Sequence, residues 1–296
     1  MKMKVFARTI LFLAAVFALL GESGFVARSQ DASVTGGVSA SNAGDRSFPV
    51  EAGARMEIEI KGVKTAFRWA PPGSFTRRWN GRTAIFWEKP TDGEQDFEIT
   101  LTRGFWLAET ETTQELWQTV MWSYNPSEGV RTERAPVNNV SWDETQEFIA
   151  RLNCDGYAPG GFEFRLPTEA QWEYACMAGS TGERCGELDA IAWYGANSEG
   201  RAHEVGLKKA NDWGLYDMLG NVWEWCADRY GKYPMGNITD YAGPQEGSYR
   251  VSRGGGWDDS AERCGRSCRD YWSGRSFWNG GDGRLGFRLA LVPKER

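Results

Sequence analysis

The chain has 296 residues, of which 41% are hydrophobic and 14% aromatic, and its formal net charge is −6. This apolar content is sufficient for a buried core. The negative charge, without a basic stripe of interleaved aromatic residues, argues against a nucleic-acid-binding surface. The single histidine, His203, excludes a multi-histidine zinc or iron site within this chain, and its polar neighbours are typical of a surface loop.

At the N-terminus, three basic residues precede the apolar run Ile10–Leu20, which is too short for a membrane-spanning helix. The pattern predicts a signal peptide over residues 1–27 and therefore an exported protein, periplasmic or secreted, with no stable membrane span after signal removal. An uncleaved anchor is the alternative. Residues 28–50 are small and polar and predict a flexible linker, so that residues 51–296 form the folded domain.

The folded domain begins with a period-two alternation over Met56–Ile60, which predicts a strand. Three helix starts follow, each marked by a hydroxyl residue three positions before a glutamate or glutamine. These capping boxes begin at Thr112, Ser141 and Thr168. Apolar residues recur behind each cap at helical spacing, which indicates that these helices face the core.

After Ala178 the helical signals stop, and glycine, asparagine and tryptophan become frequent. The chain has 36 glycines and 15 tryptophans, which predicts tight turns that carry large side chains rather than long regular elements. Short strands are expected near Arg250–Ser252 and Phe287–Val292.

Two carboxylates, Asp217 and Glu224, lie at the ends of a turn that contains Gly220. Carboxylate and carbonyl oxygens are the ligands that Ca²⁺ prefers. A turn held by carboxylate-to-amide hydrogen bonds explains the same spacing without a metal, and the spacing alone favours that reading.

Six cysteines could form up to three disulfides in an oxidising compartment, with fifteen possible connectivities. Cys264 and Cys268 are close in sequence on a glycine-flanked segment. Two such thiols could bind Cu(I), which favours thiolate ligands, or could enter disulfides. The cysteines are Cys154, Cys176, Cys185, Cys226, Cys264 and Cys268.

Glycine-punctuated, tryptophan-rich blocks follow one another in a specific order along the chain. The blocks are Phe105–Gln114, Pro136–Trp142, Arg165–Tyr174, Gly214–Asp228, Arg250–Trp257 and Leu285–Leu289. From about Phe67 to Val292 the chain resembles the formylglycine-generating enzyme, or sulfatase-modifying factor, family. The resemblance implies an irregular, loop-rich α+β domain with little regular secondary structure, related to C-type-lectin-like folds.

The resemblance also implies metal sites and a thiol pair. One structural Ca²⁺ would be held by the side chains of Asp217 and Glu224 and the carbonyls of Gly220 and Val222, and a second calcium site would begin at Asn197. In the family's oxidases two cysteines bind copper; the resemblance places the first at Cys264 and the second at Arg269, one residue after Cys268. The segment Cys264–Arg269 also resembles a wider bacterial pattern in which arginines serve as structural ion-pair partners.

Two functions follow from the resemblance. The first is oxidation of a cysteine of a sulfatase-like protein or peptide to formylglycine, with Cu(I) and oxygen at Cys264 and Cys268. The second is a non-catalytic module that binds a protein or glycan ligand in an aromatic groove around Trp257, Tyr271, Trp272 and Trp278. A third class, the sulfoxide synthases that carry this domain, needs a histidine-rich partner domain, which this chain lacks.

Overall fold

The computed structural model describes residues 51–77, 96–122, 124–273 and 283–295, which belong to one compact unit. The predicted signal peptide and linker lie outside these residues. Among the described residues, no helix has the length and apolar character that crossing a membrane requires.

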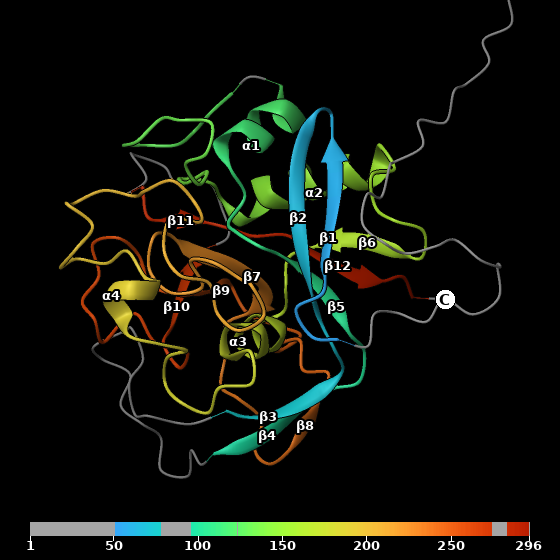
Figure 1. Ribbon diagram of the computed structural model, residues 1–296. Coiled ribbons are helices and arrows are strands. Elements are labelled where there is room, and N and C mark those ends of the chain that lie inside the picture. Colours follow the sequence, from blue (N-terminus) through green and yellow to red (C-terminus); the bar gives the residue numbers. More distant parts are fainter. Residues whose placement is uncertain (1–50, 78–95, 123, 274–282, 296) are drawn as a thin grey trace, which may run out of the picture. The chain divides into compact units, whose positions relative to one another are not determined.

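The first sheet has five strands, and the β1–β2 hairpin forms one side of it (Figure 1). The period-two alternation at Met56–Ile60 lies in β1, as predicted. β12 lies between β5 and β6, so the C-terminal strand is inserted between earlier strands and every pairing in the sheet is antiparallel. In spatial order the strands are β1 (Arg55–Ile60), β2 (Val63–Ala70), β5 (Phe105–Ala108), β12 (Ala290–Pro293) and β6 (Phe162–Arg165).

The second sheet has four strands and the third has three. The order in the second is β10 (Arg269–Ser273), β9 (Tyr249–Arg253), β7 (Trp223–Arg229) and β11 (Leu285–Gly286). The order in the third is β3 (Gly73–Arg77), β4 (Phe97–Leu101) and β8 (Ile238–Thr239). The strand predicted near Arg250–Ser252 is β9, whereas that near Phe287–Val292 begins only at Ala290.

Two of the three predicted helix caps are confirmed. Ser141 caps α2 (Trp142–Cys154) and Thr168 caps α3 (Glu169–Met177), each with the reciprocal bonds of a capping box. The third prediction is wrong by one residue, because Thr113 rather than Thr112 caps α1 (Gln114–Met121). The Thr112 backbone is already bonded to Phe287 O and Val137 N, both at 2.8 Å, and cannot enter the helix.

The short α4 (Leu188–Ile191) completes the helices of the described residues. α1 and α2 lie next to each other beside the first sheet, and α3 packs on β7 and β9 (Figure 1). Short strands and helices joined by long irregular segments make this a loop-rich α+β structure, as predicted.

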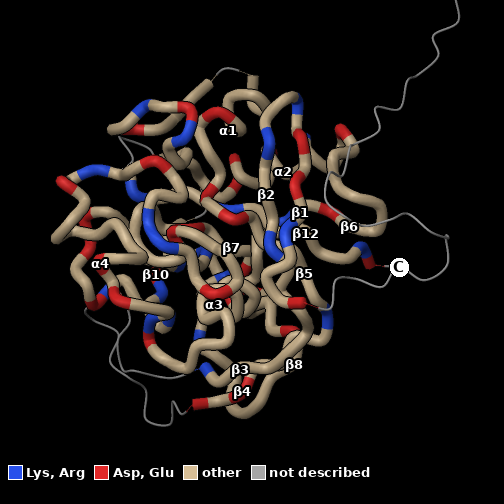
Figure 2. Tube along the Cα trace, viewed as in Figure 1, with Lys and Arg blue, Asp and Glu red and all other residues tan. Residues whose placement is uncertain are grey.

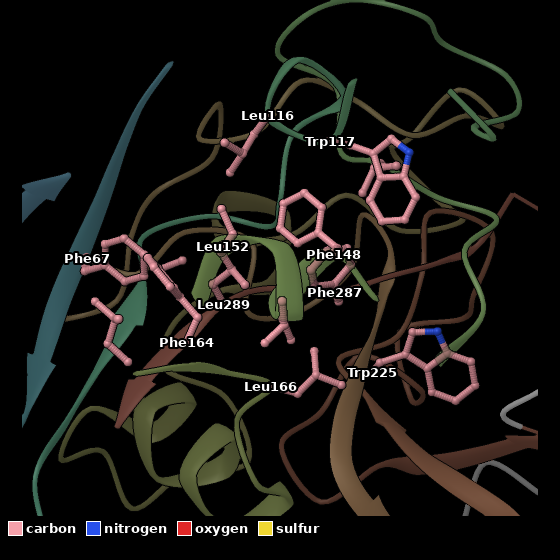
Figure 3. Close-up of a cluster of buried hydrophobic side chains, with 14 of the residues drawn as sticks. Phe67, Leu116, Trp117, Phe148, Leu152, Phe164, Leu166, Trp225, Phe287 and Leu289 are labelled. Atoms are coloured by element: carbon pink, nitrogen blue, oxygen red, sulfur yellow. The ribbon is translucent and has the colours of Figure 1, made fainter. Parts of the chain in front are cut away.

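Aromatic rings form the centre of the first hydrophobic cluster (Figure 3). Trp117 of α1 stacks on Phe148 of α2 at 5.3 Å between ring centroids, and Phe287 meets Phe148 edge-on at 5.4 Å. The cluster thereby joins two helices to the segment before β12, and it confirms that the apolar stripes of α1 and α2 face the core.

Candidate functional site

The turn before β7 has a backbone that most side chains would not tolerate. Asp217, Gly220 and Asn221 all have positive φ, at 52°, 78° and 57°. A Cβ on Gly220 would lie 2.2 Å from the Trp193 carbonyl oxygen, so this position requires glycine. The glycine spacing of the sequence therefore reflects a tight turn packed against another backbone segment.

Two buried carboxylates converge behind this turn. Asp217 Oδ2 accepts a hydrogen bond from the Gly206 amide at 2.7 Å, and Glu111 Oε1 accepts one from the Asn221 amide group at 3.1 Å. The other oxygen of each carboxylate is buried without a hydrogen-bond partner. Burial raises the pKa of Asp217 to about 6, and burial together with the Asp217 charge raises the pKa of Glu111 well above its usual range.

The third carboxylate, Glu224, is engaged differently. Its Oε1 lies 2.5 Å from Arg288 Nη2, and its Oε2 accepts hydrogen bonds from Arg288 Nε and Trp172 Nε1, both at 2.7 Å. Arg288 also donates to the Tyr216 carbonyl at 3.0 Å. In this arrangement Glu224 is the partner of a buried guanidinium.

The calcium ligands implied by the resemblance fit this site in part. Asp217 offers a buried oxygen that lacks a partner, whereas Arg288 and Trp172 engage both oxygens of Glu224. Glu111 was not identified from the sequence; the available signal was an acidic residue within one of the blocks that carry the resemblance, Phe105–Gln114. Among the described residues, no group of three or more His, Cys, Asp or Glu side chains is arranged around a metal position. One guanidinium faces three carboxylates, which leaves an excess of negative charge.

Asn197 and His203 lie on the loop that precedes this turn. The Asn197 amide accepts a hydrogen bond from Tyr194 N at 2.9 Å and donates one to Ala192 O at 3.0 Å, so it closes its own turn. His203 stacks on Trp193 with ring centroids 3.8 Å apart, and its Nε2 lies 2.7 Å from Ser198 O. Both side chains thus hold the local fold of this loop.

The two thiols of interest lie at the ends of a short turned segment. Cys264 is 0% exposed and Cys268 is 4% exposed, and they belong to different core clusters. Burial raises the pKa of each thiol to about 12. Both are therefore protonated near neutral pH, which disfavours nucleophilic attack and metal binding in this conformation. All six cysteines fall within the described residues, and in this structure each is a free thiol.

Arg269, the residue after Cys268, joins a buried ionic cluster on α3. It lies 2.9 Å from Glu169, Arg77 lies 2.7 Å from Glu173, and Arg253 also contacts Glu173 at 2.5 Å. Figure 2 shows both acidic and basic positions in the region of α3. The interpretation of Arg269 as a structural ion-pair partner is confirmed, because it links β10 to α3.

Three tyrosines gather on the second sheet, next to this ionic cluster. They are Tyr230, Tyr249 and Tyr271, and we call them the tyrosine face. The ring centroid of Tyr271 lies 4.5 Å from that of Tyr230 and 4.8 Å from that of Tyr249, and Tyr249 is 48% exposed. In the β9–β10 register, Tyr249 and Tyr271 point to the same side of the sheet as the buried Arg253. The buried ion pairs therefore lie on the same face of the sheet as a partly exposed aromatic surface.

The aromatic groove predicted from the sequence differs from this surface. Tyr271 and Trp272 are consecutive on β10 and point to opposite faces, and Trp272 packs against the first hydrophobic cluster. The prediction that both line one groove is wrong for this reason. Trp257 donates its indole N–H to Gly283 O at 3.3 Å, and Trp278 lies outside the described residues.

Comparison with known proteins decides the family. The sulfatase-modifying factor enzyme 1-like domain matches residues 61–292, which is most of the chain. The chain belongs to this family. It is 29% identical over 216 residues to the chaperone protein LppX of Paenibacillus barcinonensis, covering 56% of this chain and 73% of that protein.

A second relative and a solved structure show how much of this sulfatase-modifying-factor-like chain is similar to known proteins. It is 31% identical over 174 residues to the formylglycine-generating enzyme of Streptomyces coelicolor, spanning 52% of this chain and about half, 52%, of that enzyme. The solved structure of Treponema denticola variable protein 1 superposes with a TM-score of 0.70 at 30% identity and covers 83% of this chain and 100% of that one.

Proposed function

We propose that this chain is an exported, non-catalytic member of the sulfatase-modifying factor family that binds a protein or peptide ligand through the tyrosine face. The observation that carries the proposal is the state of the thiol pair. Cys264 and Cys268 are buried, and their pKa values of about 12 keep them protonated. An oxidase that works on a substrate thiol needs reachable thiolates.

The tyrosine face has the composition of a recognition surface. Tyrosine and arginine are enriched at protein–protein interfaces, because each combines a large contact area with hydrogen-bonding groups. Tyr249 is about half exposed and Tyr230 and Tyr271 are partly exposed, whereas the buried Arg269 lies 4.3 Å from the Tyr230 ring centroid and is fixed by Glu169. A rigid support reduces the side-chain ordering that binding would otherwise require. The name of the relative LppX, a chaperone protein, also favours a protein ligand.

A displayed library of random peptides, selected on the immobilised protein, tests this assignment. The variant Tyr249→Ser/Tyr271→Ser removes two rings of the face, and Tyr124→Ser removes a tyrosine that is 65% exposed elsewhere. Peptides selected on the wild type should bind the double variant at least about tenfold more weakly and the Tyr124 variant equally well. Equal binding to all three proteins, or binding of neutral glycans in place of peptides, would contradict the proposal.

The alternative function is the copper-dependent oxidation of a sulfatase-type cysteine. The relative named formylglycine-generating enzyme, 31% identical, favours it. Cys264 and Cys268 would then hold Cu(I), which supplies oxygen activation, and both thiols would have to lose their protons and become accessible. Oxidation of the cysteine in a sulfatase-type peptide to formylglycine is expected only of the oxidase, so an assay of this conversion distinguishes it from the binding function.

Calcium at the turn before β7 is a further part of the proposal. Glu111 and Asp217 each present a buried oxygen without a hydrogen-bond partner, and a divalent cation would offset the excess negative charge there. The carbonyls of Gly220 and Val222 would add ligands. A second calcium at Asn197 and kinship with C-type-lectin-like folds remain predictions of the resemblance.

A further inference from the structure

The segment that connects α3 to α4 lies against the turn that contains the thiol pair. We call residues 180–187 the strap; most of them are exposed. Glu183 accepts hydrogen bonds from Ser267 N at 3.0 Å and Ser267 Oγ at 2.6 Å, and its carbonyl accepts one from Arg266 N at 3.1 Å. The acidic residue of the strap therefore holds the second half of the Cys264–Cys268 turn.

Arg184 holds the first half of the same turn. Its Nε donates to Cys264 O at 3.0 Å, and its Nη2 donates to Ala261 O. Neighbouring residues of opposite charge thus hold both ends of one turn, and hydrogen bonds from charged groups are stronger than neutral ones. A Cβ on Gly265 would lie 2.5 Å from Glu183 Oε1, which shows how closely the strap approaches the turn.

The other side of the turn is closed by the core. A Cβ on Gly255 would lie 2.8 Å from Cys264 Sγ, so the β9 end leaves no room beside that sulfur. The Cys268 carbonyl accepts a hydrogen bond from the buried Arg253. The core therefore packs against this side of the turn, whereas the strap on the other side is mostly exposed.

We propose that the strap is a movable cover that controls access to Cys264 and Cys268. Gly179 follows the C-cap of α3 with φ 86°, in open space, and Gly186 lies at the other end, so the segment has glycine near both ends. The strap contacts the turn through hydrogen bonds, and Cys185 of the strap packs on the second hydrophobic cluster. Mostly exposed segments that are held by few contacts belong to the parts of a protein that open locally without global unfolding. This inference holds whether the chain binds a ligand or oxidises one.

Pulsed labelling of the reduced, full-length protein with iodoacetamide, followed by peptide mass spectrometry, tests the proposal. The variant Glu183→Ala/Arg184→Ala removes the strap contacts. Glu199→Ala/Arg201→Ala is the matched control, because it deletes the same two residue types from an exposed ion pair of 3.1 Å. Cys154, which is exposed, reports reagent reactivity, and Cys226, which is 0% exposed, reports global unfolding.

In the strap variant, Cys264 and Cys268 should be labelled at least about tenfold faster than in the wild type, because lost charged hydrogen bonds favour local opening. Cys154 and Cys226 should be labelled at wild-type rates, and the control variant should behave as the wild type. Unchanged labelling of Cys264 and Cys268 would overturn the proposal. Parallel acceleration at Cys226 would also overturn it, since the thiols would then be exposed by unfolding of the core.

Discussion

Asp228 lies at the N-terminus of α3, where its Oδ2 accepts a hydrogen bond from the Glu169 amide at 2.7 Å. Burial, and then the negative charge of Glu169, raise the pKa of Asp228 to about 7. A carboxyl group whose pKa is higher in the folded state than in the unfolded state binds a proton on folding. Its contribution to stability therefore falls as the pH rises from about 4 to about 7.

Asp228→Asn keeps an acceptor for the Glu169 amide and removes the buried charge. We expect the variant to be more stable than the wild type at pH 8, by on the order of 3 kcal/mol, with a smaller difference at pH 5. Urea unfolding at both pH values measures this difference. Asp212→Asn, at an exposed position, should show neither effect. A variant that is less stable than the wild type at pH 8 would refute the argument.

Glu111 and Asp217 provide the residue-scale test of calcium binding. Ca²⁺ should raise the melting temperature of the protein by several degrees above its value in EGTA, because a ligand that binds only the folded state stabilises it. Glu111→Gln keeps the acceptor for Asn221 and removes a ligand charge, so the shift should shrink. Glu133→Gln, at an exposed position, should retain the full shift. Calcium is absent from this site if the wild type melts at the same temperature in both buffers.

At the scale of elements, the sequence predicts helix starts better than strand partners. The caps at Ser141 and Thr168 are local, since each involves residues within one turn. The cap of α1 is shifted from Thr112 because the distant residues Phe287 and Val137 hold its backbone. No sequence spacing reveals such contacts, and the same is true of Arg288, which occupies Glu224 in the predicted calcium site.

The two neighbouring threonines give opposite predictions. Thr113→Ala should destabilise the protein by about 1 kcal/mol, because Thr113 Oγ1 caps the Leu116 amide at 3.2 Å. Thr112→Val should be neutral or stabilising, since the Thr112 hydroxyl is buried without a hydrogen-bond partner. Chemical denaturation of both variants provides the comparison. The assignment of the cap fails if the Thr112 variant loses more stability than the Thr113 variant.

At the scale of the whole molecule, the fold class and family could be predicted because the glycine and tryptophan blocks reflect turns and large buried rings. The thiol pair could not be judged from spacing. Its chemical state depends on the burial of Cys264 and Cys268 in the two core clusters, and residues that hold the turn between them, such as Glu183, lie about 80 positions away in the sequence. The proposal of a binding module therefore rests on the tertiary enclosure of these thiols, which sequence spacing does not reveal.

The most direct test of this account is mass spectrometry of a sulfatase-type cysteine peptide after incubation with the reduced, Cu(I)-supplied protein in oxygenated buffer. The account predicts that the cysteine stays a thiol and that the wild type and Cys264→Ser give identical spectra. Conversion of the cysteine to an aldehyde by the wild type, with loss of the conversion in Cys264→Ser, would contradict it.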